Sequence, residues 1–267
     1  MPFTCKTDIS IYYELKGEGN RVLFISGTGG DLRIKPNVLD GPLAKSSQVL
    51  AFDQRGLGQT EKPATDYTML DYANDAIQLM DELGWDTANV IGVSFGGMVA
   101  LNLAVQHPDR ISKLVLCCTS PGGPNMASYP LHELPEEWSE ADRIRKMISI
   151  NDLRLDDNWQ QENATRVNEM IRVAVDMKPE DHQSPEFKAG AKRQLMARAG
   201  HSVVEALPNI QIPTLICAGK YDGMASAKNQ ESMQEMMPEA ELAWFEGGHL
   251  FLVQDKSAWP AIINFLE

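Results

Sequence analysis

The stretch Gly92-Val93-Ser94-Phe95-Gly96 decides how the rest of this chain is interpreted. It matches Gly-x-Ser-x-Gly, a sharp strand-to-helix turn that holds a serine hydroxyl above a parallel sheet. Glycine suits both outer positions because a turn this sharp brings backbone segments too close together for a Cβ atom. The flanking residues agree with this interpretation: 88–91 predict a short buried strand, and 95–107 predict a helix that ends before Pro108.

The size and composition of the chain predict one large α/β domain with an inserted subdomain. The chain has 267 residues, of which 43% are hydrophobic, and a formal net charge of −13. Such an acidic balance argues against nucleic acid and against an anionic membrane surface as partners, since both require clustered Lys and Arg. No apolar run approaches the roughly 18 residues of a membrane span, and no secretory signal is visible. We therefore expect a cytoplasmic protein; a monomer and a homodimer both stay open at this point.

The four cysteines are typical of reduced thiols with a structural role. Cys117, Cys118 and Cys217 fall within apolar, strand-like runs, where a small buried thiol packs well. The fourth, Cys5, lies near the N-terminus. No group of Cys and His has the spacing of a zinc site, so no metal is expected.

Most of the chain alternates between strand-like and helix-like segments. The strand candidates are short, continuous and apolar, as parallel strands covered on both faces are. They lie at 22–26, 49–52, 88–91, 114–118, 214–218 and 242–245. Helical periodicity lies between or after them, at 67–83, 226–237 and 256–266, and the first residues predict a hairpin of 4–7 with 9–15. This alternation predicts an open, mostly parallel sheet with helices on both faces.

One region interrupts the alternation. From residue 121 to 207 we find no convincing strand, only a loop rich in Pro and Gly and then helical stretches at 136–150, 158–176 and 185–199. An insertion between two core strands predicts a helical cap, or lid subdomain, over the carboxyl edge of the sheet, where α/β sites lie. Residues 1–120 and 208–267 would then form the core domain.

A serine hydroxyl needs a base to take its proton and a group that orients that base. Of the five histidines, His249 is the candidate base, because it follows the last strand candidate and would lie at the carboxyl edge of the sheet. Asp222 is the candidate orienting acid, because it follows the strand candidate at 214–218. The chain order Ser, Asp, His agrees with this assignment. Asp255 is the alternative acid.

The same chemistry needs two hydrogen-bond donors where negative charge develops on the substrate. We expect one to be the backbone N–H of Phe95, directly after the serine, and the other to be the backbone N–H of Thr28. Thr28 lies in the loop Ser26-Gly27-Thr28-Gly29-Gly30, after the first core strand. This loop has neither the Gly-Lys-Ser/Thr of a phosphate-binding loop nor dinucleotide spacing, so no cofactor is expected.

With these motifs, the chain resembles serine hydrolases of the α/β-hydrolase fold superfamily from end to end. It is closest in character to small bacterial carboxylesterases and to hydrolases similar to 3-oxoadipate enol-lactonase. The loop Asp53-Gln54-Arg55-Gly56-x-Gly58 is similar to the family's Asp-x-Arg-Gly-x-Gly loop. The resemblance implies a mostly parallel, eight-stranded sheet with the cap inserted after the sixth strand. Ser26 departs from the usual family histidine, which leaves open whether the departure changes activity.

The resemblance implies that the chain cleaves small carboxylic esters or lactones through Ser94, His249 and Asp222. Three further residues are candidates for contact with this small-molecule substrate. Trp138 would line an apolar acyl pocket or pack inside the cap, while Arg198 and His201 lie on a polar stretch where Arg198 would bind a carboxylate or face solvent. The same scaffold also serves carbon–carbon bond hydrolases, thioesterases and perhydrolases, as well as signalling proteins that bind a ligand without catalysis. Fold-level likeness does not separate these alternatives.

Overall fold

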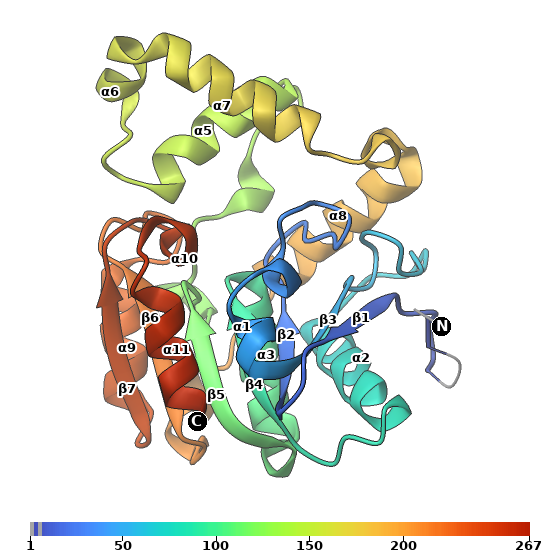
Figure 1. Cartoon of the computed structure of the whole chain (residues 1–267). Coiled ribbons are helices and arrows are strands. Elements are labelled where there is room, and N and C mark those ends of the chain that lie inside the picture. The colour runs from blue at the N-terminus through green and yellow to red at the C-terminus, as the bar shows by residue number, and fades with distance from the viewer. Residues whose placement is uncertain (1–2, 5–6) are drawn as a thin grey trace.

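The computed structural model describes residues 3–4 and 7–267. Their centre is a seven-stranded sheet in the order β1-β3-β2-β4-β5-β6-β7 (Figure 1). Only the β1–β3 pair is antiparallel, and every other neighbouring pair is parallel. The strands are β1 Tyr13–Lys16, β2 Asn20–Ile25, β3 Ser47–Phe52, β4 Ala88–Val93, β5 Ile111–Cys117, β6 Thr214–Gly219 and β7 Ala240–Phe245. The α/β-hydrolase fold expected from the sequence is confirmed, with all six parallel strand candidates present as β2 to β7.

The expected count of eight strands is wrong for the part of the chain that the structure describes. β1 pairs with β3, with Tyr13 opposite Phe52, while the Thr4 N–H donates to the Ile11 carbonyl at 3.0 Å, an antiparallel contact that belongs to the predicted hairpin. In the N-terminal segment, Phe3 makes one isolated bridge, to Tyr12. Residues 5 and 6, and with them Cys5, lie outside the described residues. The helical insertion consequently follows the fifth described strand rather than a sixth.

The two faces of the sheet are covered by different helices because side chains alternate along each strand. In β3, Leu50 and Phe52 pack on one face, and Val49 and Ala51 pack on the other. The first face is covered by α2 Met69–Glu82, α3 Phe95–Gln106 and α9 Ala227–Met236, and the second by α1 Leu43–Ser46, α10 Phe251–Gln254 and α11 Ala258–Leu266. The sheet is therefore buried on both sides, as its apolar strands predict.

The segment between β5 and β6 is helical, and we call it the insertion (residues 118–213). It contains α4 Gly123–Met126, α5 Glu140–Asn151, α6 Asp157–Glu162, α7 Ala164–Asp176 and α8 Pro185–Ala199, with 3-10 turns at Leu131–Glu133, Glu180–Gln183 and Val204–Asn209. Figure 1 shows α5, α6 and α7 together at the top of the molecule, beyond one end of the strands. Two further 3-10 turns, Val38–Asp40 and Pro108–Arg110, lie outside the insertion.

The helix predicted at 158–176 is two helices. The chain leaves the α-helical conformation at Asn163, where φ is −116° and ψ is 33°. The side-chain amide of Asn163 donates to the carbonyl of Trp159 at 2.9 Å and so takes an acceptor at the end of α6. Asn competes for backbone hydrogen bonds in this way more readily than most residues, which is why it favours helix ends. Ile148, Val167 and Ile171 then form a small apolar cluster of their own between α5 and α7.

Helix α8 approaches the core closely enough for backbone to contact backbone. A Cβ atom on Gly190 would lie 2.1 Å from the carbonyl oxygen of Gly56, so only glycine allows the helix to come this close. Just before α8, His182 Nε2 lies 2.9 Å from Asp31 Oδ2, and Arg33 pairs with both Asp31 and Asp181. These contacts join the end of the insertion to the loop after β2.

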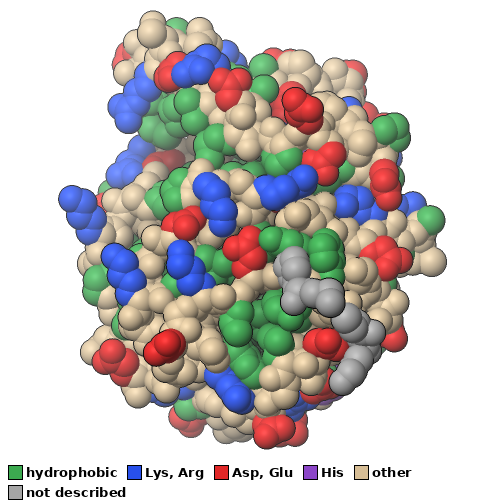
Figure 2. All heavy atoms as spheres, turned by 45° about the vertical axis from the view of Figure 1, so that its right-hand side comes forward, with side chains coloured by type: hydrophobic (Ala, Val, Ile, Leu, Met, Phe, Trp, Pro, Cys, Tyr) green, Lys and Arg blue, Asp and Glu red, His purple; other side chains and the backbone are tan. Residues whose placement is uncertain are grey.

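On the face that Figure 2 shows, acidic and basic side chains are interspersed. None of the helices in the described residues is long and apolar enough to span a bilayer.

A buried ion pair connects the loop after β3 to α2. Arg55 Nε and Nη2 donate to the two oxygens of Asp75, both at 2.6 Å. Asp75 is 1% exposed and Arg55 is 9% exposed. Removing Asp75 would leave the buried Arg55 with only the half-exposed carboxylate of Asp71, 3.6 Å from its Nη1, and this loss costs far more than the net stabilisation that the buried pair provides.

We expect Asp75→Ala to lower the free energy of unfolding by about 3–5 kcal/mol, as broken buried pairs do. Asp81→Ala is the matched control on the same helix, because Asp81 also pairs with an arginine, Arg110, but has a 58% exposed side chain. That change should cost no more than about 1 kcal/mol. Urea unfolding of both variants measures the difference, and equal costs would contradict the importance of the buried pair.

Candidate active site

The candidate nucleophile lies in a strained turn between β4 and α3. Ser94 has φ 54° and ψ −115°, a conformation that non-glycine residues rarely adopt. Its backbone N–H donates to the carbonyl of Cys117 at 2.8 Å, and its carbonyl accepts from the Thr119 hydroxyl at 2.7 Å. Strain of this kind persists only where the surroundings over-determine it, and it concentrates at functional sites.

The two glycines of the motif allow the close contacts that this turn requires. A Cβ on Gly92 would lie 2.4 Å from the carbonyl oxygen of Gly96, on the other side of the turn. A Cβ on Gly96 would lie 2.0 Å from the carbonyl oxygen of Ile25, at the end of β2. The first turn of α3 therefore lies directly against the neighbouring strand and the loop that follows it.

The structure brings Ser94, His249 and Asp222 together. His249 Nε2 lies 2.9 Å from Ser94 Oγ, and His249 Nδ1 lies 2.9 Å from Asp222 Oδ2. Ser94 follows β4, Asp222 follows β6 and His249 follows β7, so one edge of the parallel sheet collects all three. A base within hydrogen-bond reach of a hydroxyl, and itself held by a carboxylate, is the arrangement that activates a serine.

Asp222 is held in place by backbone. Its Oδ1 accepts from the N–H groups of Met224, at 2.7 Å, and Ala225, at 3.0 Å, which leaves Oδ2 for His249. The alternative acid, Asp255, has other partners: it accepts from the backbone N–H of Glu246 and from both the hydroxyl and the backbone N–H of Ser257. The structure thus puts Asp222, not Asp255, beside the histidine.

The loop after β2 lies next to the serine. A Cβ on Gly27 would be 3.5 Å from the Ser94 Cβ, so this loop borders the turn at van der Waals distance. Thr28, the predicted second donor, is exposed in this loop. The predicted first donor, the N–H of Phe95, opens α3, and the first N–H groups of a helix have no acceptor within it.

Gln194 holds the same loop from α8, a contact that sequence reasoning missed. Its Oε1 accepts from the backbone N–H of Gly29 at 3.0 Å, and its side chain is buried. Gln54 also holds the loop, donating to the carbonyl of Ser26 at 2.8 Å. Thr119, whose hydroxyl donates to the Ser94 carbonyl, was also missed. Its place at the carboxyl edge of the sheet was predictable, because it directly follows the strand candidate at 114–118.

Cys118 lies close to the same side chains. Its Sγ and one ligand atom each of Asp222 and His249 lie within 4.8 Å of one another. Burial, together with the nearby Asp222, holds the pKa of this thiol well above its usual value, whereas metal ligation requires the thiolate. Both nitrogens of His249 already face other partners. These residues therefore do not fit a metal ion.

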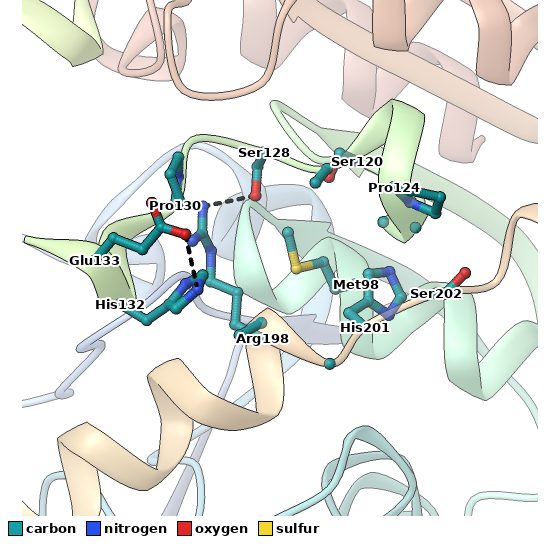
Figure 3. Close-up of a pocket in the computed structure, with 15 residues that line it drawn as sticks. Met98, Ser120, Pro124, Ser128, Pro130, His132, Glu133, Arg198, His201 and Ser202 are labelled. Carbon is teal, nitrogen blue, oxygen red and sulfur yellow. Dashed lines mark hydrogen bonds and ion pairs between the residues drawn. The ribbon is translucent and has the colours of Figure 1, made fainter.

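The three residues predicted to contact substrate do not lie in one site. Arg198 and His201 line a cavity of about 410 Å³ beside Ser120 and Ser128 (Figure 3), and Trp138 is not among its lining residues. Neither Ser94 nor His249 lines that cavity. Trp138 is half-buried in the insertion, where its carbonyl accepts from Arg143 Nε.

We expect Gly96→Ala to destabilise the protein by about 1–3 kcal/mol or more, because its Cβ would overlap backbone that side-chain rotation cannot relieve. Gly200→Ala is the control: its Cβ would meet nothing closer than 3.8 Å. Chemical denaturation measures both, and a Gly96→Ala protein as stable as the control would contradict the close approach of α3 to β2.

The comparisons with known proteins agree with the fold. A family model described as the alpha/beta hydrolase fold matches residues 20–162, more than half of the chain. A poly(3-hydroxyalkanoate) depolymerase of Ectopseudomonas oleovorans is 30% identical over 92% of this chain and 84% of its own length. A 2-hydroxymuconate semialdehyde hydrolase of Pseudomonas sp. (strain CF600) is 26% identical over 93% of this chain and 87% of its own. Among solved structures, the enol-lactonase of Burkholderia xenovorans LB400 aligns with a TM-score of 0.79 at 22% identity, covering 99% of both chains. The chain belongs to the alpha/beta hydrolase fold family, and its relatives support a hydrolase activity.

Proposed function

We propose that the protein is a serine hydrolase that cleaves small carboxylic esters or lactones without a cofactor. One observation carries the proposal: the continuous chain from Ser94 Oγ to His249 and from His249 to Asp222, with 2.9 Å at each step. The side chains of His249 and Asp222 are only 10% and 2% exposed, so the ion pair that forms during reaction would be shielded from water.

The reaction would proceed through an acyl-enzyme. His249 Nε2 accepts the Ser94 proton while Oγ attacks the substrate carbonyl, and the backbone N–H groups of Phe95 and Thr28 donate to the resulting oxyanion. The protonated His249, held by Asp222, gives its proton to the departing alcohol or enol oxygen as the C–O bond breaks. Water, deprotonated by His249, then attacks the acyl-enzyme and releases the acid with Ser94 restored.

The relatives support this class of reaction and also favour a second candidate. The depolymerase is named for poly(3-hydroxyalkanoate), and the enol-lactonase for an enol lactone. The semialdehyde hydrolase is named for a substrate that is not an ester, and it supports carbon–carbon bond hydrolysis as the second candidate. Rates on a p-nitrophenyl ester series, acetate to octanoate, and on a vinylogous diketone separate the two. A faster diketone reaction would replace the ester proposal with the second candidate.

Ser94→Ala should lower kcat on the preferred p-nitrophenyl ester by about 10³-fold or more, since the variant has no nucleophile. The fold should be kept, because the turn depends on backbone contacts and glycines rather than on the hydroxyl. Circular dichroism and a melting curve check the fold alongside the rate. Ester hydrolysis at the wild-type rate by the folded variant would refute the mechanism.

Gln194→Ala should lower kcat by about tenfold or more with little change in KM, because it releases the Gly29 N–H and with it the loop that carries Thr28. An oxyanion donor acts mainly in the transition state, so its misplacement appears in kcat. Lys192→Ala is the matched control on α8, since Lys192 is exposed and pairs with the exposed Glu136. If both variants kept wild-type kcat, Gln194 would have no part in positioning the loop.

A further inference from the structure

The cavity beside α3 is separate from the candidate catalytic residues. It has a volume of about 410 Å³ and is lined by residues from α3, from the start of the insertion and from the end of α8, including Met98, Ser120, Ser128, His132, Arg198 and His201 (Figure 3). Neither Ser94, Asp222 nor His249 lines it. Its volume falls within the range of small-molecule sites, roughly 300–1,000 Å³.

Arg198 lines this cavity as a buried cation without an anionic partner. It is 6% exposed, and its Nη2 donates to the Ser128 hydroxyl at 2.6 Å and contacts Met224 Sδ at 3.3 Å. Among the described residues, no carboxylate lies within 4.0 Å of its guanidinium. Arg55 is the other buried arginine among the described residues, and it is paired with Asp75. Burial lowers the pKa of Arg198 to about 10, and no opposing charge restores it.

The polar groups around Arg198 are mostly donors. His201 Nδ1 lies 3.2 Å from the side-chain amide nitrogen of Asn102, which also donates to the carbonyl of Met98, so Nδ1 accepts and the ring proton is on Nε2. Burial lowers the pKa of His201 to about 4, so the ring is neutral at pH 7. The Arg198 Nε and the Ser120 hydroxyl oxygen are both buried without a hydrogen-bond partner among the described residues, while the His201 ring interacts with the backbone of Ser120.

One acid lies among the residues that line the cavity. Glu133 has a side chain that is 68% exposed, and its carboxylate is 3.7 Å from His132 Nε2 rather than beside Arg198. Figure 3 shows the Arg198 side chain directed toward Ser128, with His132 and Glu133 paired next to it. The positive charge of Arg198 can therefore pair with an anionic ligand that enters the cavity.

We propose that this cavity is a binding site for a small carboxylate, held by Arg198. A buried arginine without a counter-charge carries a desolvation cost that an anion would offset. The planar guanidinium suits a carboxylate better than it suits a spherical ion, because its N–H groups match the two carboxylate oxygens. The proposal does not depend on Ser94 as a nucleophile, because the cavity excludes that residue.

The test is a comparison of ligands on the wild-type protein at constant ionic strength. Acetate and succinate should raise the melting temperature in a concentration-dependent way, as any ligand that binds the native state does. Acetamide and succinamide, which have similar shape but no charge, should not. Inorganic phosphate is the second arm: a shift with phosphate but not with the carboxylates would overturn the choice of ligand, and no shift with either would overturn the site.

Variants assign the effect to Arg198. Arg198→Met should weaken succinate binding by about tenfold or more in titration calorimetry, the loss expected when a hydrogen-bonded charge is removed. Arg193→Met is the matched control on the same helix; Arg193 donates to the carbonyl of Ala64 and does not line this cavity. Arg198→Gln keeps a donor for Ser128 and provides the same test if Arg198→Met does not fold. Unchanged succinate affinity in the Arg198 variants, or an equal loss in Arg193→Met, would overturn the proposal.

Discussion

The backbone contact between the start of α3 and the end of β2 is the constraint on which the rest of the site depends. It exists only because residue 96 has no side chain. The contact fixes where α3 begins, and with it the rare backbone conformation of Ser94. The same packing brings the loop after β2 to within van der Waals distance of Ser94. This contact thus links the position of the nucleophile to that of the loop, which Gln194 and Gln54 hold in addition.

The parallel sheet supplies the second requirement, which is convergence. The carboxyl ends of parallel strands lie at the same edge of the sheet. Loops that are more than 150 residues apart in sequence therefore meet at this edge. Asp222 and His249 follow neighbouring strands at this edge, and Thr119 follows the strand between those of Ser94 and Asp222. Strand order, rather than any local motif, decides which of the many acids in this chain faces the histidine.

Much of this arrangement was predictable because it depends on local sequence patterns. Short apolar runs predicted the parallel strands. A polar residue that directly follows such a run was predicted to lie at the carboxyl edge of the sheet. The break at Asn163 was not predicted, because a single asparagine within a periodic segment competes with the helix only weakly. The contact between Gln194 and Gly29 spans 165 residues and depends on how α8 docks, so no local signal carries it. The absence of a carboxylate beside Arg198 was also not predicted, because residues 187–204 contain no acid and the packing of distant segments decides whether one reaches the guanidinium.

The two halves of the insertion are attached in different ways. Helix α8 lies on the core backbone to backbone, at Gly190 and Gly56, and its side chain Gln194 holds the loop after β2. Helices α5 and α7 share an apolar cluster of their own, and the core touches the end of α5, where the carbonyls of Ile150 and Asn151 accept from the N–H groups of Gly223 and His249. Substitutions inside that cluster can be compensated within it, whereas a change at Gly190 moves α8 and everything that α8 holds. We therefore expect changes of length to be tolerated in α6 and α7, but neither at Gly190 nor at the end of α5, whose carbonyls accept from the loops that carry Asp222 and His249.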